Sequence, residues 1–116
     1  WGMTGHVVYR AIDAQRPATC SPDVIARAIR GAIGFAGPLL TDDLSMNALK
    51  GGVDERAAAA LAAGCDVALH CNGRMDEMQA IANREPQGLA LDARFRDHEF
   101  GAGRSRARSR HQCDEH

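Results

Sequence analysis

Two adjacent carboxylates at the end of an apolar run are the residues of this sequence best placed for chemistry. The run at 38–40 leads through a threonine into Asp42 and Asp43, within GPLLTDDLSMNAL (37–49). A carboxylate at such a position could act as a nucleophile, a metal ligand or a general base. The simpler alternative is that one aspartate caps the following turn while the other is solvated. Spacing alone leaves these alternatives open.

A histidine and a methionine near this pair are two further candidates. His6 opens a short β-branched run, and Met46 follows shortly after the paired aspartates. His6 could face a pocket, or it could be a hydrogen-bonded residue of the core. Met46 could line a ligand site or fill space by packing. Histidines and acids do not occur in a metal-ligand spacing, so the sequence predicts no metal and no cofactor.

The elements that must position these residues alternate between strand and helix. Apolar runs predict strands at 6–9, 38–42 and 66–71, and helical periodicity predicts helices at 21–33, 54–63 and 72–82. Strands about 30 residues apart, with helices between them, are typical of parallel βαβ units. In such units the carboxyl ends of the strands open onto a pocket, and Asp42 lies at one of these ends.

Particular residues mark the helix boundaries. Ser21 can cap the free N–H groups of a first turn, and Gly34 and Gly64 are typical of helix C-termini. Asn72, which precedes a glycine, favours a turn or a helix cap over a ligand. The spacing in the first helix predicts an apolar face made of Ile25, Ala28, Ile29, Ala32 and Ile33.

The composition limits the chain to one domain with a modest core. It has 116 residues, of which 45% are hydrophobic and 4% aromatic, so aliphatic side chains and alanine must supply most of the core. A net charge of −1 gives no bias toward nucleic acid or a membrane surface. No apolar run approaches the ~20 residues of a membrane span. We therefore expect neither a nucleic-acid partner nor a membrane.

The cysteines favour free thiols. Cys65 and Cys71 bracket the third predicted strand. That strand would hold them about 20 Å apart, whereas a disulfide needs Cα atoms within about 7 Å. Free thiols are typical of a reducing compartment, so the sequence predicts a cytoplasmic location.

Residues 84–116 differ in character from the rest. They hold seven arginines and no lysine, with little periodicity. The sequence predicts a disordered, arginine-rich tail here, next to a folded unit at 1–83. The basic run could touch nucleic acid, but a solvated tail is the favoured interpretation.

Three segments resemble one enzyme family. MTGHVVYRAID (3–13), LLTDDLSMNAL (39–49) and ALAAGCDVALHCNG (60–73) occur in the order and at the spacing of the cytoplasmic β-N-acetylglucosaminidases of glycoside hydrolase family 3, the peptidoglycan-recycling type. The resemblance covers about residues 2–83, and TDDLSM is its most specific part.

The resemblance implies a fold, a reaction and roles for the candidate residues. Residues 1–83 would form the C-terminal part of a (β/α)8 barrel, with about three βα units and parallel strands. Asp42 matches the family's nucleophile, which attacks the anomeric carbon in a retaining mechanism. Asp43, His6 and Met46 would then bind substrate or support the site. The implied substrate is a muropeptide or oligosaccharide with a terminal β-linked N-acetylglucosamine.

One part of the family's machinery has no counterpart in this sequence. The resemblance implies a histidine acid/base on an upstream loop, within a KHFPGHGDT-like segment, and these 116 residues hold no such segment. We therefore expect a truncated and inactive copy of the enzyme. The alternative is a noncatalytic αβ fragment that works only by association with another chain. Open strand edges would also allow self-association.

Overall fold

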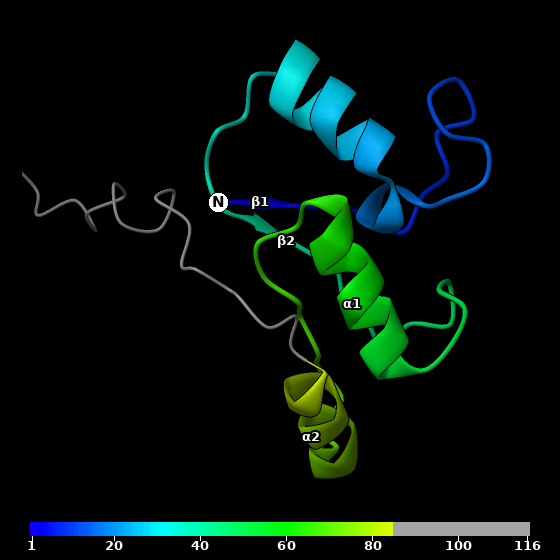
Figure 1. Cartoon of the computed structure of the whole chain (residues 1–116), viewed down its shortest axis with the longest axis vertical. Coiled ribbons are helices and arrows are strands. Elements are labelled where there is room, and N and C mark those ends of the chain that lie inside the picture. Colours follow the sequence, from blue (N-terminus) through cyan, green and yellow to red (C-terminus); the bar gives the residue numbers. More distant parts are fainter. Residues whose placement is uncertain (85–116) are drawn as a thin grey trace, which may run out of the picture.

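The chain folds as helices beside a short parallel sheet (Figure 1). The computed structural model describes residues 1–84. Its elements are β1 (Gly2–Met3), η1 (Ala18–Cys20), η2 (Val24–Ala32), β2 (Leu39–Leu40), α1 (Val53–Ala63) and α2 (Met75–Asn83). The described part is thus an α/β structure, as the sequence predicted. Apart from Arg84, the predicted arginine-rich tail lies outside the described residues.

The sheet joins its segments in chain order. β1 pairs with β2 in parallel, with Gly2 opposite Leu39 and Met3 opposite Leu40. An isolated parallel bridge then joins Leu40 to Val67. Three segments are thus parallel neighbours in chain order, as consecutive βαβ units would be, although each paired segment is short and the first is not the predicted strand at 6–9.

The predicted strand at 6–9 is wrong, because the first strand is β1. The N–H of Thr4 still donates to the carbonyl of Leu40 at 2.8 Å, and the chain then leaves the sheet. Val7 is 53% exposed and Tyr9 is 52% exposed. β-branched residues favour strands when neighbouring strands or a core pack against them, and these side chains have no such cover here.

The third predicted strand, at 66–71, is reduced to the single bridge at Val67. Beside it, a side chain takes the place of the backbone ladder. The N–H of Leu69 donates to the hydroxyl of Thr41 at 2.8 Å, and the N–H of Leu44 donates to the carbonyl of Leu69 at 2.9 Å. Regular strand pairing therefore ends where the aspartate loop (residues 42–46) begins.

Helix η2 begins where the sequence predicts but is wound differently. The Ser21 hydroxyl accepts a hydrogen bond from the N–H of Val24 at 3.2 Å, as a cap should. The helix is a π-helix, and at its end the N–H of Ile33 donates to the carbonyl of Ala28, five residues back. A π-helix rotates through a smaller angle per residue than an α-helix, so residues spaced for one α-helical face do not stay on one face. Ile25 is buried, whereas Ile33 is 73% exposed and lies off the predicted apolar face.

The second predicted helix, at 54–63, is confirmed as α1. At its start, the Glu55 carboxylate accepts a hydrogen bond from the N–H of Gly52 at 3.1 Å. At its end, Gly64 adopts a φ of +113° and donates its N–H to the carbonyl of Leu61 at 3.0 Å. This left-handed conformation is the C-terminal role predicted for glycine.

Helix α2 confirms the third predicted helix. The side-chain oxygen of Asn72 accepts the N–H of Arg74 at 3.0 Å, and its amide donates to Glu77 at 2.8 Å. Asn72 thus has the turn role that the sequence favours. The apolar side chains of this helix are only partly covered, since Met75 is 70% exposed whereas Ile81 packs against the core.

Two clusters of small and aliphatic side chains form the core, as the composition predicted. The first comprises Ile25, Leu39, Ala60, Ala63 and Cys65. The second comprises Leu44, Leu49 and Ala57, and Cys20 packs against both. Leu44 directly follows the paired aspartates and is fully buried, so the second cluster anchors their loop.

Cys20, Cys65 and Cys71 carry free thiols, in agreement with the prediction. Among residues 1–84, no helix is both long enough and apolar enough to cross a membrane.

Candidate active site

Asp42 lies just beyond the carboxyl end of β2, where parallel strands present functional groups. Its side chain is half-buried. One carboxylate oxygen, Oδ1, accepts a hydrogen bond from the backbone N–H of Asp43 at 2.8 Å. This bond directs the carboxylate from its own loop, so its orientation depends on how residue 43 is held.

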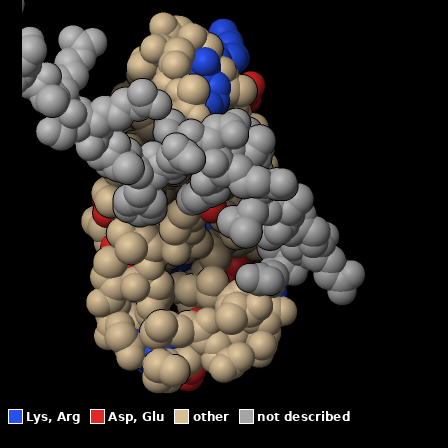
Figure 2. Space-filling model, turned by 90° about the vertical axis from the view of Figure 1, so that its left-hand side faces the viewer, with Lys and Arg blue, Asp and Glu red and all other residues tan. Residues whose placement is uncertain are grey.

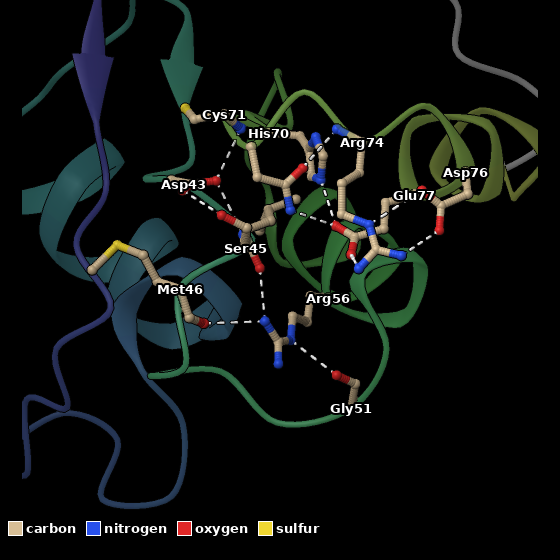
Figure 3. Close-up of polar contacts among 12 residues, drawn as sticks. Asp43, Ser45, Met46, Gly51, Arg56, His70, Cys71, Arg74, Asp76 and Glu77 are labelled. Atoms are coloured by element: carbon tan, nitrogen blue, oxygen red, sulfur yellow. Dashed lines mark hydrogen bonds and ion pairs between the residues drawn. The ribbon is translucent and has the colours of Figure 1, made fainter.

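Three hydrogen-bond donors hold the carboxylate of Asp43, as Figure 3 shows. Its Oδ1 accepts the backbone N–H groups of Ser45 at 3.0 Å and Cys71 at 3.1 Å, and its Oδ2 accepts the Ser45 hydroxyl at 2.5 Å. The hydroxyl and N–H of Ser45 hold the pKa of the Asp43 carboxyl below its ordinary value. The Asp43 side chain is therefore a structural tie between the aspartate loop and the segment after Val67.

His6 meets the same loop from the N-terminal side. Its Nε2 lies 2.9 Å from the carbonyl oxygen of Asp43, and its Nδ1 lies 2.8 Å from the hydroxyl of Thr19. That hydroxyl in turn lies 2.9 Å from the hydroxyl of Thr4. Both ring nitrogens of His6 thus have hydrogen-bond partners within the chain, and the ring is half-buried.

Met46 is 43% exposed, so its side chain is not a core residue here. Its backbone is fixed, because its N–H donates to the carbonyl of Asp43 at 3.2 Å. The guanidinium of Arg56 donates to the carbonyls of Leu44, Met46 and Gly51 at 2.8, 3.1 and 3.0 Å (Figure 3). Arg56 of helix α1 therefore fastens the loop that carries Met46.

Sequence reasoning did not single out several residues that support the site. Thr41 is fully buried, donates its N–H to the carbonyl of Val67 at 2.9 Å and accepts the N–H of Leu69. Its position inside TDDLSM was the available signal. Thr19 is also fully buried, but it lies in the short helix η1, which no pattern in the sequence predicted. Arg56 could have been suspected as a cation within an alanine-rich helix.

A second polar group lies at the base of helix α2. His70 Nε2 and Glu77 are 2.7 Å apart, and hydrogen bonds from His70 and then Asn72 lower the pKa of the Glu77 carboxyl (Figure 3). The His70 side chain is 6% exposed, and its Nδ1 has no hydrogen-bond partner within the described residues. Because Nδ1 is buried, this histidine is not open to a substrate.

A pocket of about 740 Å³ lies between residues 15–22, residues 48–50 and helix α1. His6, Arg16, Lys50 and Arg56 are among its lining residues, and Asp42 is not. The pocket therefore adjoins the site through His6. Across residues 1–84, no cluster of three or more histidine, cysteine or acidic residues could hold a metal ion.

Comparison with known proteins relates this geometry to one family. Residues 2–98 match the family described as Glycosyl hydrolase family 3 N terminal domain. The chain is 42% identical over 95 residues to a beta-hexosaminidase of Vibrio cholerae serotype O1, covering 77% of this chain and 28% of that protein. It is 47% identical over 74 residues to the beta-hexosaminidase of Tolumonas auensis, covering 62% of this chain and 22% of that protein. The chain thus spans about a quarter of the length of these relatives.

Solved structures agree with the sequence matches. A glycoside hydrolase family 3 beta-N-acetylglucosaminidase from Paenibacillus sp. str. FPU-7 superposes with a TM-score of 0.64 at 36% identity, covering 71% of this chain and 16% of that chain. A fungal multi-domain beta-N-acetylglucosaminidase of the same family gives a TM-score of 0.65 at 25% identity. With most of its length matched by the family and with relatives in both comparisons, this chain belongs to the glycosyl hydrolase family 3 N terminal domain family.

Proposed function

We propose that this chain carries the nucleophile-bearing part of the catalytic barrel of a retaining β-N-acetylhexosaminidase, with Asp42 as the nucleophile. The observation that carries the proposal is the contrast within the aspartate pair. The carboxylate of Asp43 is occupied by Ser45 and Cys71, whereas Asp42 stands half-buried at the end of β2 and is directed by a backbone N–H. Residues 1–83 would supply three consecutive βα units of a (β/α)8 barrel.

The proposed reaction uses the side chain of Asp42 as its nucleophile. One carboxylate oxygen attacks the anomeric carbon of the sugar, and the bond to the leaving oxygen breaks while an acid gives that oxygen a proton. A glycosyl-enzyme ester remains, and water releases the sugar with retained configuration. Asp43, His6 and Met46 support the loop or the sugar pocket. The acid/base belongs to a segment outside these 116 residues.

The proposed substrate is a sugar chain or muropeptide with a terminal β-linked N-acetylglucosamine. Support comes from the family and from the beta-N-acetylglucosaminidases to which the chain is similar. A cytoplasmic location also belongs to the proposal. It is supported by Cys65, whose thiol donates to the carbonyl of Thr19 at 3.7 Å in reduced form.

An alternative assigns the chain no catalysis of its own. In that case it is a noncatalytic αβ unit that works by association with another chain. The observation that favours it is the sheet, which in residues 1–84 contains two strands and one bridge, whereas a closed barrel needs eight strands.

The test separates the site from the completeness of the barrel. The 116-residue chain is assayed on an aryl N-acetylglucosaminide, and we expect little or no turnover because general acid help, worth about 10²–10⁴-fold, is missing. Residues 2–83 are then placed in the matched segment of the Vibrio cholerae beta-hexosaminidase. In this chimera Asp42→Asn should abolish turnover, and Asp43→Asn should leave measurable activity.

Each outcome bears on the proposal. Equal losses from the two substitutions would count against Asp42 as the nucleophile. A mechanism-based fluorosugar that labels a peptide without Asp42 would also overturn the assignment. Robust turnover by the 116-residue chain itself would remove the noncatalytic alternative.

A further inference from the structure

His6 reaches the aspartate loop through the backbone of Asp43 rather than through a side chain. Its Nε2 lies 2.9 Å from the carbonyl oxygen of Asp43. That residue also supplies the N–H that binds the Asp42 carboxylate at 2.8 Å. The histidine and the carboxylate are thus joined through the backbone of one residue, although 36 positions separate them in the sequence.

We propose that His6 is a positioning residue for Asp42, which it acts upon by holding the carbonyl of Asp43. The inference rests on the proposed function, in which Asp42 is the nucleophile. His6 need not touch the substrate for this role. It fixes the backbone of Asp43, and the Asp43 N–H then aims the carboxylate.

Several hydrogen bonds hold the backbone of Asp43, and His6 provides the one that comes from the N-terminal segment. On the other side of the same peptide unit, the N–H of Leu44 donates to the carbonyl of Leu69 at 2.9 Å. The peptide plane between Asp43 and Leu44 is therefore held at its oxygen by His6 and at its nitrogen by Leu69, which follows the bridge at Val67. A plane held at both ends cannot rotate without breaking one of these bonds.

The tautomer of His6 follows from its partners. A carbonyl oxygen can only accept, so Nε2 must carry the proton that it donates to Asp43. In the neutral ring, Nδ1 accepts from Thr19, and the Thr4 hydroxyl can then donate to that of Thr19. In the charged ring, Nδ1 donates to Thr19, whose hydroxyl can turn to the carbonyl of Gly5 at 3.1 Å. Both forms keep the bond to Asp43.

Burial explains why this bond has a defined geometry. Thr4 is 4% exposed and Thr19 is fully buried, so the hydroxyls that orient the ring are themselves fixed. The ring is tied to the loop on one side and to the buried threonines on the other. Loss of the Nε2 donor would leave the Asp43 carbonyl with the weaker bond from Met46 at 3.2 Å.

A first experiment reads the bond directly in the full chain. Ring-¹⁵N histidine labelling and two-bond ¹⁵N–¹H spectra report which nitrogen is protonated, and His6→Asn assigns the signal. We expect an Nε2–H that is protected from solvent exchange. A ring that interconverts freely between its tautomers, or one protonated at Nδ1 alone, would overturn the proposal whether or not the enzyme is active.

A second experiment uses the active chimera described above and two matched substitutions. His6→Gln places an amide donor near the Nε2 position, whereas His6→Asn is too short to reach Asp43. We expect His6→Asn to lower kcat on the order of 10-fold with KM little changed, because it misplaces the nucleophile. His6→Gln should restore most of that loss.

The controls separate this proposal from the proposed function. The unfolding midpoints of the two variants should agree, so that a difference in kcat between them cannot come from a difference in stability. A purely structural role would lower the midpoints without a selective loss of kcat at unchanged KM. Equal kcat values in His6→Asn and His6→Gln would refute the positioning role while leaving Asp42 as the nucleophile. An inactive wild-type chimera would count against the proposed function, and the protected Nε2–H would still decide the role of His6.

Discussion

Two neighbouring aspartates have different environments because their surroundings supply different numbers of donors. Asp43 accepts bonds from Ser45 and Cys71, two segments that are far apart in sequence. Asp42 accepts a bond from the next residue and remains half-buried. A carboxylate whose oxygens already accept several hydrogen bonds is a weaker nucleophile, and this contrast supports the proposal that Asp42 rather than Asp43 is the nucleophile.

The pH response of Asp43 can be tested through Ser45. The Ser45 hydroxyl is the foremost cause of the lowered pKa of Asp43, so Ser45→Ala should raise that pKa toward the ordinary value. A carboxyl whose pKa is lowered by folding stabilises the fold above its unfolded pKa of about 3.9, and this contribution disappears as pH falls through the folded pKa. Ser45→Ala should therefore reduce stability near neutral pH and flatten its decline in acid.

The measurement is a ¹³C titration of the Asp43 carboxyl beside denaturant unfolding at several pH values. Ser45→Thr keeps a hydroxyl and serves as the control. An unchanged Asp43 titration in Ser45→Ala would show that the backbone donors alone set its pKa.

The sequence predicted the roles of residues that interact with near neighbours, but it did not predict the contacts between residues that are far apart in the chain. Asn72 and Gly64 act on neighbours a few positions away, so their roles follow from their types. The contact of His6 with Asp43 depends on how β1 and β2 are placed side by side, which no local pattern encodes. For the same reason the sequence could locate the aspartate pair but could not say which donors would occupy Asp43.

At the scale of elements, helices were easier to foresee than strands. The boundaries of α1 follow from capping residues and alanine-rich sequence, which act within the helix. Strand 6–9 was predicted from β-branched residues, yet strands need partners, and β2 pairs with residues 2–3 instead. The winding of η2 was also not foreseen, because π-turns depend on packing more than on composition.

The glycine that ends α1, Gly64, offers a test at the scale of elements. A Cβ on Gly64 would lie 3.1 Å from the Cγ2 of Ile25, and its φ of +113° disfavours any side chain. Gly64→Ala should therefore destabilise the fold by about 1–3 kcal/mol. Gly73→Ala is the matched control, because Gly73 also has a positive φ but would place its Cβ in open space.

Denaturant unfolding of the two variants separates strain from contact. Gly73→Ala reports the conformational cost alone, and we expect it to be the milder change. If both variants lost the same stability, the contact with Ile25 would contribute nothing.

At the scale of the whole molecule, much apolar surface is uncovered. Among residues 1–84, the exposed large apolar side chains are Trp1, Met3, Val7, Val8, Tyr9, Ile33, Met46, Met75 and Met78. In the visible tan surface of Figure 2, acidic and basic atoms are sparse, and basic atoms gather toward the η2 end. With a net charge of −1, electrostatic repulsion between copies is weak.

The open edge of β1 makes self-association the expected behaviour of the isolated chain. Within residues 1–84, β1 pairs with β2 alone, and Met3 on it is 57% exposed. An uncharged open edge invites pairing with another chain, and a lysine blocks it. We expect sedimentation to show concentration-dependent association that Met3→Lys reduces.

The control for this prediction places the same charge away from the sheet. Ala14 is exposed in an irregular segment, so Ala14→Lys changes net charge equally without blocking the edge. Association that falls equally in both variants would point to charge rather than to strand pairing.

Alkylation of a buried and an exposed thiol can report how often the core of this chain opens. Burial raises the pKa of Cys65 to about 11, and its thiol lies in the core with a bond to Thr19, whereas Cys71 is exposed. The thiolate is the form of cysteine that attacks an alkylating reagent. Because Cys71 is exposed, it can react in the folded chain, whereas Cys65 can react only in a molecule whose core has opened. The extent of modification at Cys65, measured by peptide mapping relative to that at Cys71, would then report how often the core has opened during the exposure, without a spectroscopic probe.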